Sequence, residues 1–169
     1  MKPWKTILCP IDFSTSCARV LDVAAHVARG EGGRLILLHV TDAHGELPEA
    51  AIVTGDDGPV SIARYARESA LRELERCAAP LRARDLAVDT AFAVGAAVPA
   101  ILRAAADLGA DIIVMGTHGR TGLAHVVLGS VAERVLRASP IPVLTVRQVA
   151  GDEAHATAAE ERLAAERDG

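Results

Sequence analysis

The sequence predicts a three-layer α/β fold, in which a five-stranded parallel sheet carries helices on both faces. Two observations lead to this prediction. Short apolar segments alternate with helical segments in the order βαβαβαβαβ, and the connections between successive strands are too long for hairpins. Several strand segments are also apolar without alternation, which is typical of parallel strands covered above and below.

The first strand and the first helix are predicted at 6–12 and 17–29. Residues 6–12 form a short apolar run that ends in a polar residue, as buried strands do. The helical segment has apolar side chains at helical spacing, and Ser14 or Ser16 is placed to cap it. Glycines then end this helix: Gly30, Gly32 and Gly33.

Residues 34–40 predict a central strand because they are apolar on both faces. Residues 41–59 mix Gly, Pro, Asp and His without a period, so we expect a long loop that is either functional or mobile. Residues 61–84 are rich in Ala, Arg, Glu and Leu. They predict a long amphipathic helix, which Pro80 kinks or breaks near its end.

The second half of the chain repeats the alternation, with a strand at 86–94, a helix at 99–108, a strand at 111–116, a helix at 130–138 and a last strand at 143–147. Pro99 stands in the first turn of its helix, where proline is tolerated. Ser130 and Glu133 have the spacing of a capping box, in which each side chain bonds a free backbone amide of the other.

The formal net charge of −4 is concentrated at the C-terminal end. Residues 150–169 hold six acidic and two basic residues, whereas acids and bases balance in residues 1–149. We therefore expect one folded domain at 1–149 and an acidic tail at 150–169. There is no basic run, and aromatic residues make up only 2% of the chain, so nucleic acid is not an expected partner.

We expect a cytoplasmic protein with no membrane partner. Residues 1–5 are not followed by the apolar region of a signal peptide, and the longest apolar runs are strand-sized. The three cysteines are odd in number and lack metal spacing. Cys17 follows the start of the first helix, where its pKa would be lowered, or it is a small core residue.

The most informative segment is the glycine-punctuated loop between a buried strand and the helix at 130–138. Gly116 and Gly119 let the backbone approach a ligand, and Gly129 and Ser130 open a helix whose first amides lack partners. Such a helix end favours a phosphate. The alternative is a plain loop in which Ser130 is only an N-cap. A P-loop is excluded because the only lysines are Lys2 and Lys5.

With these motifs the chain resembles the universal stress protein family over roughly residues 3–148. The matching segments are Gly116, Gly119, Gly129 and Ser130, then Pro10-Ile11-Asp12, His39-Val40, and Ser139-Pro140-Ile141-Pro142-Val143. The resemblance implies a Rossmann-like fold of the adenine nucleotide α-hydrolase type, and the ATP-binding branch of the family. The domain at 1–149 would then be a nucleotide-binding domain.

The resemblance also implies roles for single residues. Asp12 would bind the ribose hydroxyls, and the backbone of Val40 would bind the adenine edge. Arg120 would pair with a terminal phosphate or stay solvated. The expected cofactor-binding set is Pro10, Ile11, Asp12, Val40, Met115, Gly116, His118, Gly119, Arg120, Gly129, Ser130 and Val131. The expected cofactor is ATP, with or without Mg²⁺. A bound Mg²⁺ would have its coordination shell completed by Asp12 or water.

The expected function is a nucleotide-dependent sensor or regulator in stress adaptation, and this role rests on the resemblance. The alternative is an enzyme: a slow ATPase, or a protein that phosphorylates itself at Ser130 or a nearby Thr. No residue is assigned as catalytic. A zinc site formed by His39 and His118 with Cys9 or Asp12 matches no metal motif.

A homodimer is expected through the last strand. Val143, Leu144, Thr145 and Val146 form a short apolar strand that the resemblance places at one edge of the sheet. An exposed apolar edge must be covered or paired, and pairing with a second copy across a two-fold axis would satisfy it. The alternative is that the tail covers this edge.

Overall fold

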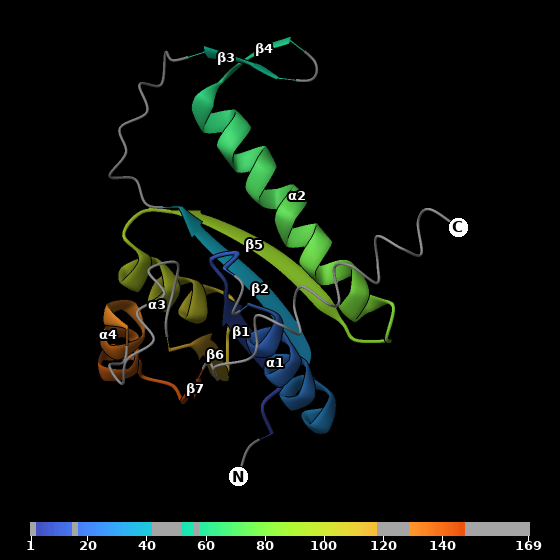
Figure 1. Ribbon diagram of the computed structural model, residues 1–169. Coiled ribbons are helices and arrows are strands. Elements are labelled where there is room, and N and C mark those ends of the chain that lie inside the picture. Colours follow the sequence, from blue (N-terminus) through green and yellow to red (C-terminus); the bar gives the residue numbers. More distant parts are fainter. Residues whose placement is uncertain (1–2, 15–16, 42–51, 56–57, 118–128, 148–169) are drawn as a thin grey trace.

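The predicted parallel sheet is present in the computed structural model, which describes residues 3–14, 17–41, 52–55, 58–117 and 129–147 (Figure 1). The sheet has the order β5-β2-β1-β6-β7, and every neighbouring pair is parallel. Its strands are β1 (Thr6–Pro10), β2 (Arg34–Thr41), β5 (Val88–Val94), β6 (Ile112–Gly116) and β7 (Val143–Val146). From β1 the chain adds β2 and then β5 on one side, and it crosses back to place β6 and β7 on the other side of β1. The topological switch point therefore lies between β1 and β6.

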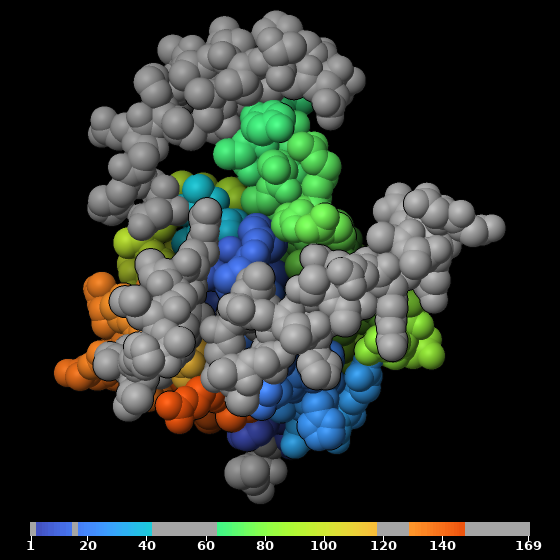
Figure 2. Space-filling view, in the orientation of Figure 1, coloured from blue at the N-terminus to red at the C-terminus, as the bar shows by residue number. Residues whose placement is uncertain are grey.

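In the described residues, four helices cover the two faces: α1 (Cys17–Glu31), α2 (Ile62–Arg82), α3 (Ala97–Asp107) and α4 (Ser130–Ala138). The apolar clusters place α1 and α2 on one face and α3 and α4 on the other. Figure 2 looks onto the first of these faces, with α1 in blue and α2 in green. In β1, Ile7 and Cys9 point toward α1 and α2, whereas Leu8 points toward the opposite layer. This double burial explains the continuous apolar runs.

The expected loop at 41–59 is wrong in its second half. There the chain forms an antiparallel hairpin of β3 (Ile52–Gly55) and β4 (Gly58–Ser61), which lies beside the N-terminal end of α2 (Figure 1). The two strands are separated by Asp56 and Asp57, a two-residue spacing typical of hairpins. Glycine and proline inside such short strands hide the period-two pattern. Residues 42–51 lie outside the described part of the chain.

Several helix ends also differ from the predictions; α3, for example, begins at Ala97, two residues before Pro99. Gly30 does not stop α1, which continues to Glu31 and ends at Gly32, whose φ of +58° is a conformation that favours glycine. Pro80 does not break α2, which continues to Arg82. A proline this near the C-terminal end affects only the last turn, and α2 continues past it.

The amino-terminal side of the sheet is tied together by Lys5 and Asp111. The Lys5 Nζ donates to the carbonyl oxygens of Glu31 at 2.6 Å and Gly32 at 3.3 Å, where α1 exposes unpaired carbonyls. The Asp111 carboxylate accepts from the backbone N–H of Lys5 at 2.9 Å and of Thr6 at 3.0 Å. These contacts join the start of β1 to the end of α1 and the start of β6.

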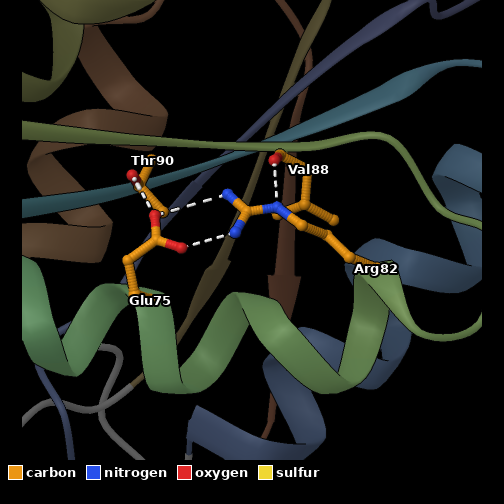
Figure 3. Close-up of polar contacts among 4 residues, drawn as sticks. All are labelled: Glu75, Arg82, Val88 and Thr90. Carbon is orange, nitrogen blue, oxygen red and sulfur yellow. Dashed lines mark hydrogen bonds and ion pairs between the residues drawn. The ribbon is translucent and has the colours of Figure 1, made fainter.

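The outer edge of β5 carries a polar clamp from α2 (Figure 3). The bonds from Leu35 N to Ala87 O and from Gly95 N to Thr41 O, both 2.9 Å, show that odd-numbered residues of β5 face β2. The Val88 carbonyl therefore faces outward, and Arg82 Nε donates to it at 2.8 Å. The Arg82 guanidinium also pairs with Glu75 and holds the pKa of that carboxyl below its usual range.

Candidate functional site

The N-terminal end of α4 is anchored beside the carboxyl end of β6. Gly129 N donates to Thr117 O at 2.6 Å, and Thr117 N donates to Val146 O at 3.0 Å. Thr117 and Gly129 therefore lie side by side at the carboxyl edge of the sheet. This point lies next to the C-terminal end of β1, because β1 and β6 are neighbours.

The predicted capping box is wrong. Gly129, with φ −59° and ψ 147°, is the N-cap, and Ser130 is the first helical residue with no side-chain cap bond. The first bond of the helix runs from Glu133 N to Gly129 O at 2.9 Å. The amides of Ser130, Val131 and Ala132 precede it and have no helical acceptor. The correction strengthens the anion site, because these amides point out of the helix end.

Asp12 follows the end of β1 and is fixed by the turn into α1. Its Oδ1 accepts from Ser14 N at 3.1 Å and from Ser14 Oγ at 2.7 Å. The Cys17 thiol contacts the same oxygen at 3.6 Å. Asp12 therefore orders the turn that leads into α1. The hydrogen bonds described for this carboxylate all involve Oδ1, so Oδ2 is the oxygen that can bind a ligand.

Val40 presents its backbone past the end of β1. Arg34 N donates to Lys5 O, and Ile11 N donates to Leu38 O, both at 2.8 Å. Even-numbered residues of β2 therefore face β1, and the backbone N–H and C=O of Val40 point the same way. The pairing of β1 with β2 stops at Pro10 and Leu38. One donor and one acceptor of Val40 are thus open at the sheet edge, beyond the last residue of β1.

The profile of the universal stress protein family matches residues 3–147, which is most of the chain. The chain belongs to the universal stress protein family.

Curated relatives and solved structures agree with this assignment. This universal stress protein is 32% identical to universal stress protein MJ0577 of Methanocaldococcus jannaschii over 156 residues, covering 86% of this chain and 96% of that one. It is 31% identical over 150 residues to universal stress protein YxiE of Bacillus subtilis, covering 83% and 97%. The solved structure of MJ0577 superposes with a TM-score of 0.71 at 30% identity, covering 88% of this chain and 99% of that one.

A universal stress protein crystallised in complex with cAMP also shares the fold. It has a TM-score of 0.61 at 24% identity and covers 88% of this chain and 100% of its own. At that identity the likeness establishes the architecture of the sheet and its helices.

The remaining expected residues of this universal stress protein are only partly brought together. Pro10 ends β1, and Gly116 ends β6 beside Thr117. Ile11 and Met115 are core residues, 6% and 5% exposed, so only their backbone can take part in a site. Val131 lies in the first turn of α4. The others lie outside the described residues: His118, Gly119 and Arg120.

Sequence reasoning missed the side chains that hold the segment around Asp12 in place. The Nδ1 of His39 lies 2.9 Å from the Ile11 carbonyl oxygen, and its ring stacks on Phe13 with centroids 4.3 Å apart. Among the described residues, no group of three or more His, Cys, Asp or Glu is placed to hold a metal. Phe13 belongs to no motif, and its adjacency to Asp12 is the signal that could have found it. Ser14 was expected only as a candidate cap of the first helix, and its bonds to Asp12 were not foreseen.

Of the two alternatives for Cys17, the structure favours the small core residue, because burial raises the pKa of its thiol instead of lowering it. The side chain packs against the core formed by α1 and α2. Its desolvation outweighs the field of the helix end, and the thiol stays protonated beside Asp12.

A shallow groove lies elsewhere, between β5 and α3. Its volume is about 520 Å³, and Ala93, Val94, Pro99, Arg103 and Asp107 are among the residues that line it. None of the expected cofactor-binding residues lines it. The candidate site is formed instead by strand ends and a helix end.

In the described part of the chain, no helix is long and apolar enough to cross a membrane.

Proposed function

We propose that this universal stress protein binds ATP at the carboxyl edge of its sheet and acts as a nucleotide-dependent regulator in the cytoplasm. The observation that carries the proposal is the position of α4. Its open amides, on Ser130, Val131 and Ala132, stand where Gly129 is bonded to Thr117 at the end of β6. An open helix end beside the switch point of a parallel sheet is a recurrent site for nucleotide phosphates.

The other parts of the ligand have partners along the same edge. Asp12 offers a carboxylate oxygen to the two hydroxyls of a ribose, and a carboxylate only accepts hydrogen bonds. Val40 offers one backbone donor and one acceptor, which match the acceptor and the amino group on the edge of adenine. Guanine presents the opposite pattern there, so we expect GTP to bind more weakly. That this fold can hold an adenine nucleotide is supported by the relative crystallised with cAMP.

The phosphate site is tested most directly by Ser130→Pro. Proline at the first helical position removes one amide donor and keeps the helix, and Gly129 already has the extended conformation that must precede a proline. We expect calorimetry to show ATP affinity reduced by about tenfold, since one hydrogen bond to a charged group is lost. Adenosine, which lacks phosphates, should bind as it does to the wild type.

The matched control is Ala97→Pro. Ala97 is the first residue of α3, its N-cap Ala96 has φ −61° and ψ 130°, and Ala97 is not one of the expected cofactor-binding residues. This variant should keep the ATP affinity of the wild type. Equal ATP affinity in all three proteins would place the phosphates elsewhere. A wild type without measurable ATP binding would refute the proposed function.

A further inference from the structure

We infer that His39 positions Asp12 for a ribose diol, so that this protein selects ribonucleotides over 2′-deoxyribonucleotides. The inference rests on the proposed function and assigns a task to a side chain that does not itself touch the ligand.

The His39 ring replaces a backbone bond that a regular sheet would make. Ile11 N donates to Leu38 O at 2.8 Å, so continued parallel pairing would bring Val40 N onto Ile11 O. Instead, Nδ1 of His39 lies 2.9 Å from that oxygen. A carbonyl only accepts, so Nδ1 carries the proton and donates. The ring thereby satisfies Ile11 and leaves the Val40 amide open.

Phe13 completes the arrangement. Its φ is 60°, a left-handed conformation that an aromatic residue rarely adopts. The ring stacks on His39 with an interplanar angle of 25° and packs against the core beneath α1 and α2. His39 therefore holds both residues that flank Asp12, Ile11 by a hydrogen bond and Phe13 by ring contact.

The carboxylate is held in the same way. Ser14 supplies its backbone N–H and its hydroxyl to Oδ1, and Cys17 contacts that oxygen from the first turn of α1. With Oδ1 occupied, Oδ2 is the oxygen presented to a ligand. A ribose donates to it from two adjacent hydroxyls, whereas a 2′-deoxyribose has lost one of them.

The test is the ratio of the affinities for ATP and 2′-deoxy-ATP, measured by calorimetry. The wild type should prefer ATP by about tenfold, because a hydrogen bond to a charged group is at stake. In His39→Leu the donor is gone, β1 can pair one residue further, and the ratio should fall toward one. In His39→Asn the amide nitrogen stands near the place of Nδ1, so the preference should return. A general loss of stability would not depend on the sugar.

The matched control is His26→Leu, because His26 is exposed on α1 and should leave the ratio unchanged. If His39→Leu does not fold, His39→Gln replaces it in the test. The amide nitrogen of glutamine lies one bond further from the backbone than Nδ1 of histidine, so it is misplaced for the Ile11 carbonyl oxygen. A reduced ratio in Gln and a restored ratio in Asn support the inference. A wild-type ratio in either the Leu or the Gln variant overturns it. A wild type that binds both nucleotides equally also overturns it, while ATP binding as such would stand.

Discussion

At the scale of single residues, Gly33 and Gly30 differ in whether a side chain would fit. A Cβ on Gly33 would lie 2.8 Å from the carbonyl oxygens of Trp4 and Lys5, which are backbone atoms of the adjoining strand region. A Cβ on Gly30, inside α1, would meet nothing within 4 Å. We expect Gly33→Ala to lower the free energy of unfolding by about 2 kcal/mol. Gly30→Ala should raise it by roughly 0.5–1 kcal/mol. Urea denaturation of both variants measures this contrast, and equal changes would contradict it.

The buried thiol of Cys9 gives a prediction about pH. Burial raises the pKa of Cys9 well above its ordinary value of 9.0, and the thiols of Cys17 and Cys77 raise it further. In the unfolded chain this thiol ionises at its ordinary value, while the folded protein keeps it neutral. Its contribution to stability is therefore complete below about pH 9 and is lost as the pH rises above that.

The measurement is the slope of unfolding free energy against pH between 9 and 10.5. One such thiol contributes up to about 1.4 kcal/mol per pH unit. Cys9→Ala should show a shallower decline than the wild type, whatever its stability at neutral pH. Parallel slopes in the two proteins would show that Cys9 ionises equally well in both states.

At the scale of the elements, the strands that are buried on both faces can be predicted from the sequence. Contacts that depend on how two strands are aligned cannot. The strands containing Leu8, Ile36 and Ile113 are readable because both faces are buried, and the alternation with helices then fixes the parallel sheet. The cap of α4 was misassigned because Gly129 and Ser130 are both good N-caps, and only the backbone angles distinguish them. The contact of His39 with Ile11 joins two strands, so local pattern cannot reveal it.

The clamp on β5 is an element-scale device that protects an edge strand. Arg82 covers the outward carbonyl of Val88, and Glu75 accepts from the hydroxyl of Thr90 at 2.9 Å (Figure 3). A bare strand edge invites pairing with other chains. These charged groups are exposed, so their loss should cost little stability.

We expect Arg82→Ala to aggregate faster than the wild type at elevated temperature, with thioflavin T fluorescence and light scattering as readouts. Arg76→Ala is the control, because Arg76 pairs with Glu73 on the same helix and makes no contact with β5 among the interactions described for it. Equal aggregation rates in the two variants would remove the protective role from the clamp.

At the scale of the whole molecule, the two edges of the sheet differ. β5 is guarded by α2, whereas β7 lies at the other end of the strand order. Ile113 N and Thr117 N donate to Pro142 O and Val146 O, both at 3.0 Å, so even-numbered residues of this strand region face β6. The backbone groups of Val143 and Thr145 consequently point outward. Large apolar side chains are exposed nearby, with Leu144 at 37% and Leu136 at 48%.

The outward-facing amides of β7 show which proline substitution tests the predicted homodimer. Proline at Val146 would break a bond to β6, whereas Thr145→Pro removes only an outward donor, which an edge strand tolerates. We expect light scattering to find a dimer for the full chain and a monomer for Thr145→Pro. Thr145→Ala keeps the amide and should remain dimeric. A chain ending at Ala150 should also be dimeric, because the pairing needs no residue of the tail. A monomeric full chain would refute the dimer, and a dimer that survives the proline would move the interface away from β7.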